Sequence, residues 1–446
     1  MIQYSREIEV RYQADIFIAG GGPSGCAAAW AAALAGKKVI LAEACGALGG
    51  MGTMGRVPAF CMFTDGKNFL AGGFGRLIHD TCIQRGAVSP DTNEYRALNR
   101  EGISIVSEKL KTIYDDIVVG CGTEVHFFTK VIDVIGKGSH IEYVVCSGQS
   151  SIFAIEAEVS IDCTGDGVLA YYAGARFAYG DSKGNVQAGT LCSLWSDIDW
   201  DKAREKGYHG KSPRNGKMLQ KAYGDGVISV CDPHLPGMWR VGQTVGGGNI
   251  GHIFSIDGTD EMSLTEGMLA GRAMLKEYEE YYRRYLEGFE NAVPIDSGAL
   301  MGIRETRRIV GDYVLTYEDF LRKAFFEDEI GRYNYEIDAH ASSIGSNDAD
   351  EHKELIRCGL EEGESYGIPY RCLTPKGFDN LLVAGRCISC DHYMQASVRA
   401  MPGCFITGQA AGQAAAMAVE DHAAVNCLDT EILRKRLREI GAYLPE

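Results

Sequence analysis

The sequence predicts an α/β fold in which a Rossmann-type dinucleotide-binding domain with a β-meander is interleaved with a mixed α+β domain. Residues 14–43 read as a strand, a glycine-rich turn, a helix and a second strand that ends in an acidic residue. Residues 124–155 hold four short alternating segments, which is typical of a meander. A strand at 380–384, followed by a helix of small residues, indicates that the chain returns to the first domain near its end.

The first motif carries the strongest signal. Asp15–Ala19 is a short apolar run, and Gly20-x-Gly22-x-x-Gly25 follows it directly, before a helix predicted from Ser24 to Ala35. The first glycine permits a tight turn, the second lets the backbone approach a pyrophosphate, and the third allows the helix to pack closely on the sheet. The helix N-terminus offers N–H groups to phosphates. We therefore predict a dinucleotide site rather than a glycine-rich turn without a ligand.

An acidic residue follows the second strand at the spacing that a ribose contact requires. Glu43 follows the apolar run Val39–Leu41 after one further residue and lies 23 residues beyond Gly20. A carboxylate there repels a 2′-phosphate, so NADP is disfavoured. A second glycine turn, Gly49–Gly55, begins six residues later, and a plain NAD domain does not need it.

Helices and short strands follow in the next hundred residues. A helix is expected at 72–85, and apolar positions three to four residues apart predict another at Arg100–Val119. The predicted meander strands are Glu124–Phe128, Val131–Ile135, Ile141–Cys146 and Ser151–Ile155.

A separate buried strand, Val159–Asp162, is predicted to enter a turn that contains Thr164, Gly165 and Asp166. Asp166 is expected to brace this turn or a cofactor. The alternative is that Asp166 caps the helix that follows.

The pattern changes after residue 177. A strand is expected at Gln187–Trp195 and a long charged helix at Leu264–Phe289. The segment Gly246–Gly251 repeats the GxGxxG spacing, but a predicted strand, His252–Gly258, follows it instead of a small-residue helix. We therefore predict no second dinucleotide domain.

Composition narrows the class of protein. A chain of 446 residues is too long for one simple core, and 46% hydrophobic with 23% charged residues describes an ordinary soluble globular protein. The net charge of −16 argues against nucleic acid and anionic membrane partners.

Cysteine usage and the N-terminus favour a cytoplasmic protein. The 15 cysteines are scattered singly, the first residues lack a signal-peptide core, and the longest apolar run, Cys26–Ala35, is too short to span a bilayer. Only Cys387-x-x-Cys390 has redox or metal spacing, and a redox dithiol there is the less favoured interpretation. No metal site is predicted.

Four separated motifs carry a family resemblance. They are Gly49-Gly50 after the acid, Asp162-Cys163-Thr164-Gly165-Asp166-Gly167, the segment GIRETRRIVGDY at 302–313, and Arg399-Ala-Met-Pro-Gly-Cys404. The chain resembles the FAD-dependent oxidoreductase family, among the flavoproteins related to glutathione reductase and the fumarate reductase flavoprotein. It departs from the family pattern at Cys163, where alanine is usual, and at RAMPGC, where relatives read RVMPTC.

The resemblance implies one FAD per chain. It places Val131 at the adenine, the end of strand 380–384 at the ribityl chain, and the helix after Arg399 at the flavin pyrimidine edge. The expected cofactor-binding residues are Gly20, Gly22, Pro23, Ser24, Gly25, Glu43, Ala44, Gly49, Gly50, Met51, Val131, Thr164, Gly165, Asp166, Gly385, Arg386, Arg399 and Gly403.

The expected domains are discontinuous. Residues 1–55, 96–176 and 372–446 are assigned to the FAD-binding domain, and residues 56–95 and 177–371 to a substrate or cap domain.

Four residues are candidates for catalysis. His392 follows Gly385-Arg386 on a predicted linker that would pass the flavin face, and Arg371 could hold an anionic group in the same cleft. His252 follows a glycine turn, and Arg304 lies in the family segment. Each could instead be an ordinary hydrogen-bonding or ion-paired residue, and His340 near Asp338 is a weaker fifth candidate.

The expected function is FAD-dependent hydride transfer to or from a small organic, potentially anionic substrate. The electron donor or acceptor is unidentified, and a homo-oligomer is left open. The alternatives are a flavin-dependent oxidase or oxygenase, an FAD-carrying electron-transfer subunit of a larger redox complex, and a thiazole-synthase-like biosynthetic enzyme.

Overall fold

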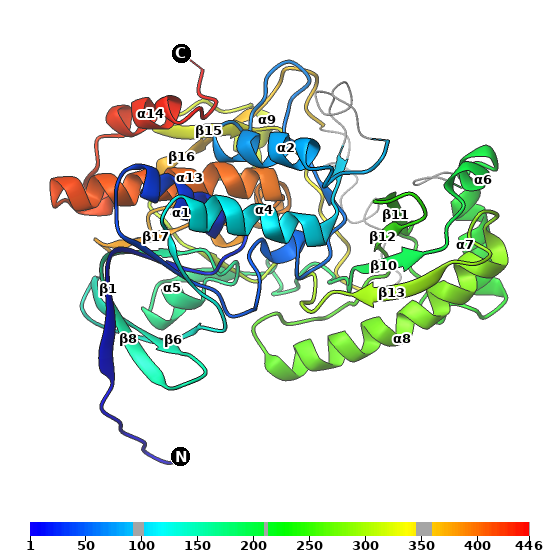
Figure 1. Cartoon of the computed structure of the whole chain (residues 1–446), viewed down its shortest axis with the longest axis horizontal. Helices are drawn as coiled ribbons and strands as arrows, with labels where there is room; N and C mark the ends of the chain where they lie inside the picture. Colours follow the sequence, from blue (N-terminus) through cyan, green and yellow to red (C-terminus); the bar gives the residue numbers. More distant parts are fainter. Residues whose placement is uncertain (92–101, 209–212, 345–358, 446) are drawn as a thin grey trace.

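A computed structural model describes residues 1–91, 102–208, 213–344 and 359–445. These residues form two bodies that lie side by side, a larger one that holds both termini and a smaller one flanked by the long helix α8 (Glu261–Tyr285) (Figure 1). The larger body surrounds a seven-stranded sheet and the smaller one a four-stranded sheet. The predicted α/β class with a Rossmann-type domain and a meander is confirmed.

The large sheet combines parallel strands with the predicted meander. Its order is β5-β2-β1-β8-β7-β6, and β17 also pairs with β8. The strands are β1 (Glu9–Ala19), β2 (Val39–Ala42), β5 (Glu124–His126), β6 (Lys130–Lys137), β7 (His140–Ser147), β8 (Ile152–Asp162) and β17 (Leu381–Val383). Strands β5, β2, β1, β8 and β17 pair in parallel, and β6, β7 and β8 pair antiparallel. The meander therefore has three of the four predicted strands. The strand predicted at Glu124–Phe128 is β5, which lies beside β2 at the opposite edge of the sheet from β6.

One strand joins the two halves of this sheet. The two strands predicted at Ser151–Ile155 and Val159–Asp162 are a single strand, β8, which pairs with β1 along both halves. The residues between them include Glu156, which is half-buried, and Glu158, which is exposed, so β8 can continue with these side chains outside the core. The first half of β8 also pairs with β7, and the second half pairs with β17.

Two helices of small residues pack unusually close beside this sheet. A Cβ at Gly408 of α13 (Met401–Asp421) would lie 2.2 Å from the carbonyl oxygen of Ser24 in α1 (Pro23–Leu34). A Cβ at Gly412 would lie 2.3 Å from that of Ala28. Only glycine permits this contact, which brings the N-terminal ends of both helices to one side of the sheet.

The other helices of the larger body follow the predictions only in part. They are α2 (Phe74–Gln84), α4 (Ser107–Gly120), α5 (Val168–Tyr172), α9 (Tyr317–Leu321), α12 (His392–Val398) and α14 (Thr430–Glu439). Helix α4 begins at Ser107, because Ile103–Ser104 forms strand β4 beside β3 (Ala59–Phe60). The start predicted at Arg100 lies outside the described residues.

The smaller body has its own core. Its sheet has the order β11-β12-β10-β13, and Trp195 and Tyr282 are among the buried residues between the sheet and its helices. The strands and helices are β10 (Ser193–Ser196), β11 (Gly237–Arg240), β12 (Gly246–Asn249), β13 (Val293–Ser297), α6 (Trp200–Glu205), α7 (Pro213–Gly224) and α8. The strand predicted at Gln187–Trp195 is confined to β10, and the one predicted at His252–Gly258 is not formed.

The second GxGxxG segment is structural. Gly246, Gly247 and Gly248 lie in β12, where a Cβ at Gly247 would lie 2.5 Å from Cβ of Pro58. The glycines therefore let the sheet pack against neighbouring side chains, and no helix follows them. The prediction that this segment holds no second dinucleotide fits this arrangement.

The two cores divide the chain differently from the predicted domains. Buried residues of 59–87 and of 309–373 pack in the core of the larger body, whereas the smaller core takes its buried residues from 191–301. Two further ribbons, β9 (Phe177–Tyr179) with β14 (Arg307–Ile309) and β15 (Glu329–Tyr333) with β16 (Tyr366–Pro369), belong to the connecting segments. Short 3₁₀ turns occur at Gly50–Gly52, Tyr370–Cys372, Gly385–Cys387 and Val425–Cys427.

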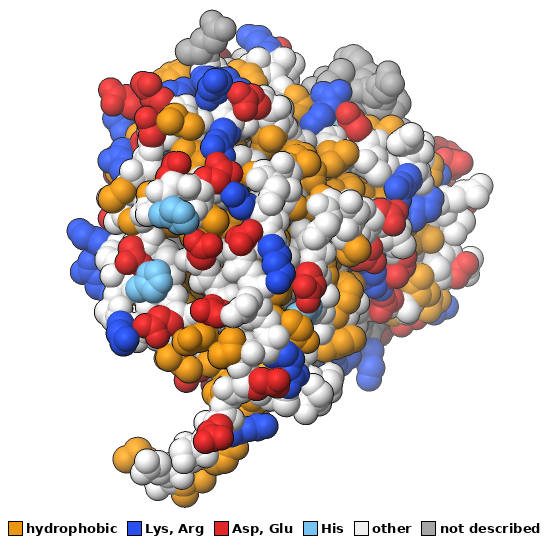
Figure 2. All heavy atoms as spheres, turned by 60° about the vertical axis from the view of Figure 1, so that its left-hand side comes forward, with side chains coloured by type: hydrophobic (Ala, Val, Ile, Leu, Met, Phe, Trp, Pro, Cys, Tyr) orange, Lys and Arg blue, Asp and Glu red, His pale blue; other side chains and the backbone are white. Residues whose placement is uncertain are grey.

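The surface gives no sign of a large single-sign patch on the face drawn in Figure 2, where acidic and basic side chains are interspersed. The N-terminal residues project from the body (Figures 1 and 2). Within the described ranges, every helix is too short or too polar to cross a bilayer.

Candidate active site

A cavity of about 1000 Å³ brings together residues of both bodies. We call the part of its lining formed by the glycine-rich turn and Glu43 the first end, and the part formed by Arg304, His234 and His340 the far end. A volume at the upper end of the usual range for ligand sites suits a large ligand with room for a second, small one.

The glycine-rich turn forms an open cradle at the first end. Gly20 has φ +93°, and a Cβ there would lie 2.7 Å from the carbonyl oxygen of Cys163. A Cβ at Gly22 would meet nothing within 4 Å, and no side chain caps the helix that starts at Pro23. The first turn of α1 therefore faces the cavity with its N–H groups available to an anionic ligand.

Glu43 is held at the end of β2 by the backbone. Its Oε2 accepts a hydrogen bond from Gly21 N at 2.7 Å, and its Oε1 accepts one from Cys45 N at 2.8 Å. Each carboxylate oxygen keeps a second lone pair, so the group is oriented and can still accept from a ribose hydroxyl.

The turn after β8 is braced by two acids with different partners. Asp162 is buried and accepts hydrogen bonds from Thr164 N, Thr164 Oγ1 and Ala170 N, although burial raises its pKa above the ordinary value. Asp166 Oδ1 accepts from Arg386 Nη2 at 2.7 Å and from Thr306 Oγ1 at 2.8 Å. The alternative that Asp166 caps a helix is wrong, because the residue before α5 is Gly167, and the first-turn N–H groups of Val168 and Ala170 donate to Thr164 Oγ1 and Asp162 Oδ2, each at 2.9 Å.

Four predicted cofactor residues lie behind the cavity wall. All predicted cofactor residues except Gly25, Gly49, Gly385 and Gly403 line the cavity. A Cβ at Gly25 would lie 1.8 Å from Gly20 O, one at Gly385 2.5 Å from Ser24 Oγ, and one at Gly403 2.8 Å from Val398 O. These glycines permit close packing that shapes the cradle.

Arg399 lies two residues before α13 and also lines the cavity. Its Nη1 donates to Gln187 Oε1 at 3.1 Å and its Nη2 to Asp338 O at 2.7 Å. Burial lowers the pKa of Arg399 to about 10, against a raising effect of Asp338, so the guanidinium stays charged at neutral pH.

Arg304 lies at the far end. Its Nη1 donates to Ala188 O at 2.6 Å and to Thr190 Oγ1 at 3.0 Å, and both neutral oxygens orient the guanidinium. The pKa of nearby His340 is lowered well below its ordinary value, first by burial and then by the charge of Arg304. The imidazole is therefore neutral at neutral pH.

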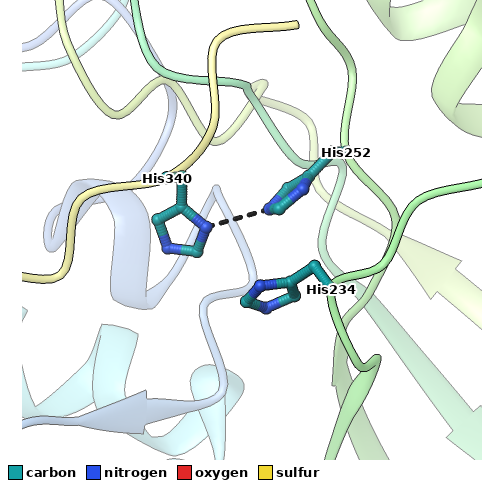
Figure 3. Close-up of side chains that lie close together, drawn as sticks. All are labelled: His234, His252 and His340. Atoms are coloured by element: carbon teal, nitrogen blue, oxygen red, sulfur yellow. Dashed lines mark hydrogen bonds between the residues drawn. The ribbon is translucent and has the colours of Figure 1, made fainter. Parts of the chain in front are cut away.

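Three histidines meet beside Arg304. His234 and His340 line the cavity, and His252 lies behind them with its Nε2 2.9 Å from His340 Nδ1 (Figure 3). The candidate His252 is thus close to the cavity but does not line it. His234 was not among the predicted site residues, because nothing in the local pattern relates it to residues 252 and 340.

Two predicted catalytic residues lie elsewhere. His392 is the first residue of α12, a helix capped by Asp391 where a linker was predicted, and its Nδ1 lies 2.9 Å from Glu305 Oε1. Arg371 Nε donates to Asp328 Oδ2 at 2.9 Å. Neither side chain lines the cavity, so the expectation that both face one cleft is wrong.

The Cys387-x-x-Cys390 pair is also unsuited to redox exchange. Both cysteines are buried and free, and burial raises the pKa of each thiol far above its ordinary value. Because the thiolate is the reactive form, this environment disfavours the dithiol alternative.

Comparison with protein-family models gives a match over most of the chain. The family model described as FAD dependent oxidoreductase matches residues 15–437. No curated protein matches the chain significantly.

Solved structures with similar folds are distant in sequence. A geranylgeranyl bacteriochlorophyll reductase-like protein from Thermoplasma acidophilum is 13% identical, with 96% of this chain and 83% of that chain covered and a TM-score of 0.47. A p-nitrophenol 4-monooxygenase from Pseudomonas putida DLL-E4 is 9% identical, with 96% and 84% covered and a TM-score of 0.46. The flavin-dependent brominase Bmp2 is 13% identical, with 96% and 83% covered and a TM-score of 0.45.

Proposed function

The chain belongs to the FAD dependent oxidoreductase family, and we propose that it transfers a hydride between bound FAD and a small anionic organic substrate. The observation that carries the proposal is that one cavity joins the glycine cradle to the guanidinium groups of Arg304 and Arg399. The cradle would bind the pyrophosphate of FAD, and the guanidinium groups favour a substrate with a negative charge.

The residues at the first end fit FAD. The open position at Gly22 and the uncapped start of α1 suit a pyrophosphate, and Glu43 suits a ribose. Val131 and Arg386 line the same cavity and would hold other parts of the cofactor. FAD supplies the two-electron chemistry when it is bound.

The side chains and helix ends of the protein supply positive charge near the cofactor and orient the substrate. The N-terminus of α13 and Arg399 line the cavity and contribute positive potential, which favours a cofactor that gains negative charge on reduction. Arg304, fixed by Ala188 O and Thr190 Oγ1, is placed to orient a substrate carboxylate. These contacts would hold the substrate in one pose.

Anaerobic reduction with a panel of small acids tests this function. We expect at least one hydroxy or amino acid to bleach the oxidised-flavin absorbance, and its methyl ester to react far more slowly. Reduction by neutral compounds alone would contradict the anionic substrate. Rapid peroxide formation in air would instead support the oxidase alternative.

NADH and NADPH are expected to reduce the bound flavin slowly and without saturation. The second GxGxxG segment is a buried strand, β12, and the described residues hold no second strand–turn–helix unit of this kind. Stopped-flow reduction with each nucleotide under nitrogen measures this directly. Fast, saturable reduction by either one would show that the electrons come from a nicotinamide.

A further inference from the structure

We propose that His234, His252 and His340 form a binding site for one divalent transition-metal ion at the substrate end of the cavity. One ligand atom of each ring lies within 4.8 Å of the others. The ring centroids are 4.6 to 5.0 Å apart, and Figure 3 shows the three rings turned toward one another. The three side chains come from the loop before β11, the loop after β12 and the segment after β15.

The spacing matches what a small metal ion requires. Two imidazole nitrogens bound to tetrahedral zinc at about 2.0–2.1 Å are about 3.3 Å apart. His252 Nε2 and His340 Nδ1 are 2.9 Å apart, so a slight separation of the rings would admit the ion. His234 then needs only a side-chain adjustment to become the third ligand, because its ring is only partly buried.

Carboxylates lie at the outer nitrogens of the two buried rings. Asp232 Oδ2 is 3.0 Å from His252 Nδ1, and Asp338 Oδ2 is 3.3 Å from His340 Nε2. A carboxylate on the distal nitrogen is the usual arrangement around a metal-bound imidazole, where it fixes the ring and raises its basicity. Asp232 Oδ1 also accepts a hydrogen bond from His234 N at 2.9 Å, so one acid positions two of the three ligands.

Counting ring protons explains why a metal completes this arrangement. Two outward contacts to carboxylates and one contact between the rings require three ring protons, but two neutral imidazoles carry two. His252 Nδ1 accordingly makes no well-directed hydrogen bond despite its short distance to Asp232. A metal between the rings removes the conflict, because both rings then donate outward and both inner lone pairs bind the ion.

The chemistry of the donors selects the metal. Three imidazoles suit Zn²⁺, Fe²⁺, Ni²⁺ or Cu²⁺, whereas Mg²⁺ and Ca²⁺ prefer oxygen ligands. The negative charges of Asp232 and Asp338 favour binding of the positive ion, whereas the positive charge of Arg304 disfavours it. Three protein ligands leave a coordination position open, and His234 and His340 line the cavity, so this position would face the substrate.

Metal binding is measured on the FAD-loaded chain, produced without a polyhistidine tag, treated with a chelator and titrated with Zn²⁺ against a chromophoric chelator. We expect one Zn²⁺ per chain. Removing a ligand in His234→Ala or His340→Ala is expected to weaken binding by about 100-fold or more, and Asp232→Asn by about 10- to 100-fold. His140→Ala is the matched control, because His140 lies on the surface beside Asp379.

FAD content, measured on the same samples, separates loss of the metal site from loss of the fold or of the cofactor. Unchanged FAD with lost Zn²⁺ affinity in His234→Ala would support the site. The proposal is overturned if the wild-type chain binds no stoichiometric Zn²⁺. It is also overturned if the ligand variants bind Zn²⁺ as tightly as His140→Ala does.

Discussion

Gly22→Asp is expected to abolish FAD binding while leaving the fold intact. Gly22 is the N-cap residue of α1 with φ −69°, a conformation that any residue adopts, and a Cβ there would meet nothing within 4 Å. Aspartate is a favourable N-cap residue, so the helix should lose no stability. Its carboxylate would instead lie where the cradle receives the pyrophosphate.

The expected loss is large because the two charges have the same sign. A unit charge about 4 Å from another costs about 4 kcal/mol at an effective dielectric constant of 20, which corresponds to roughly a thousandfold in affinity. The measurement is the ratio of FAD to protein after gel filtration, with thermal unfolding to verify the fold. Gly22→Asn has the same shape and capping ability without the charge, and it should retain much of the FAD. Equal FAD content in the Asp variant and the wild type would contradict this account of the cradle.

The nucleotide half of the molecule was predictable because its signals are local. The order of strand, turn, helix and acid within 14–43 specifies both the elements and the ligand, and the structure places Gly20, Gly22 and Glu43 at one cavity. Three strands of the β-meander were also predictable, since period-2 alternation marks each of them. The fourth, β5, pairs in parallel with β2 at the opposite edge of the sheet, because alternation does not specify the pairing partner. The break predicted in β8 failed because Glu156 and Glu158 can lie outside the core of a paired strand.

The substrate half was predicted less well because its residues meet only through the tertiary fold. His234, His252 and His340 come from three segments with no shared motif. Arg371 and His392 were expected at the cavity because they flank strand 380–384 in the sequence. Nearness in sequence does not fix the direction of a side chain, and Asp328 and Glu305 hold these two residues away from it.

Arg304→Ala is expected to slow substrate-dependent flavin reduction strongly without loss of FAD. Arg304 lines the cavity, and its hydrogen bonds go to Ala188 O and Thr190 Oγ1 rather than to the glycine-rich turn, so FAD should be retained. A hydrogen bond to a charged group contributes about 1.5–3 kcal/mol, so removing the guanidinium should lower kcat/KM by roughly 10- to 150-fold for an anionic substrate. The same variant should lose much less with the ester of that substrate, because the ester lacks the charge that Arg304 is proposed to hold.

Arg371→Ala is the matched control for this experiment. Its guanidinium pairs with Asp328 and lies over the ring of Tyr313, outside the cavity lining. The Arg371→Ala substitution removes the same kind of side chain as Arg304→Ala does, but at a site where no substrate contact is expected. Flavin reduction in this variant should therefore keep its wild-type rate. Anaerobic stopped-flow measurements on both variants decide the assignment. Slow reduction in Arg371→Ala together with normal reduction in Arg304→Ala would move the anion-binding role to the position that the sequence first suggested.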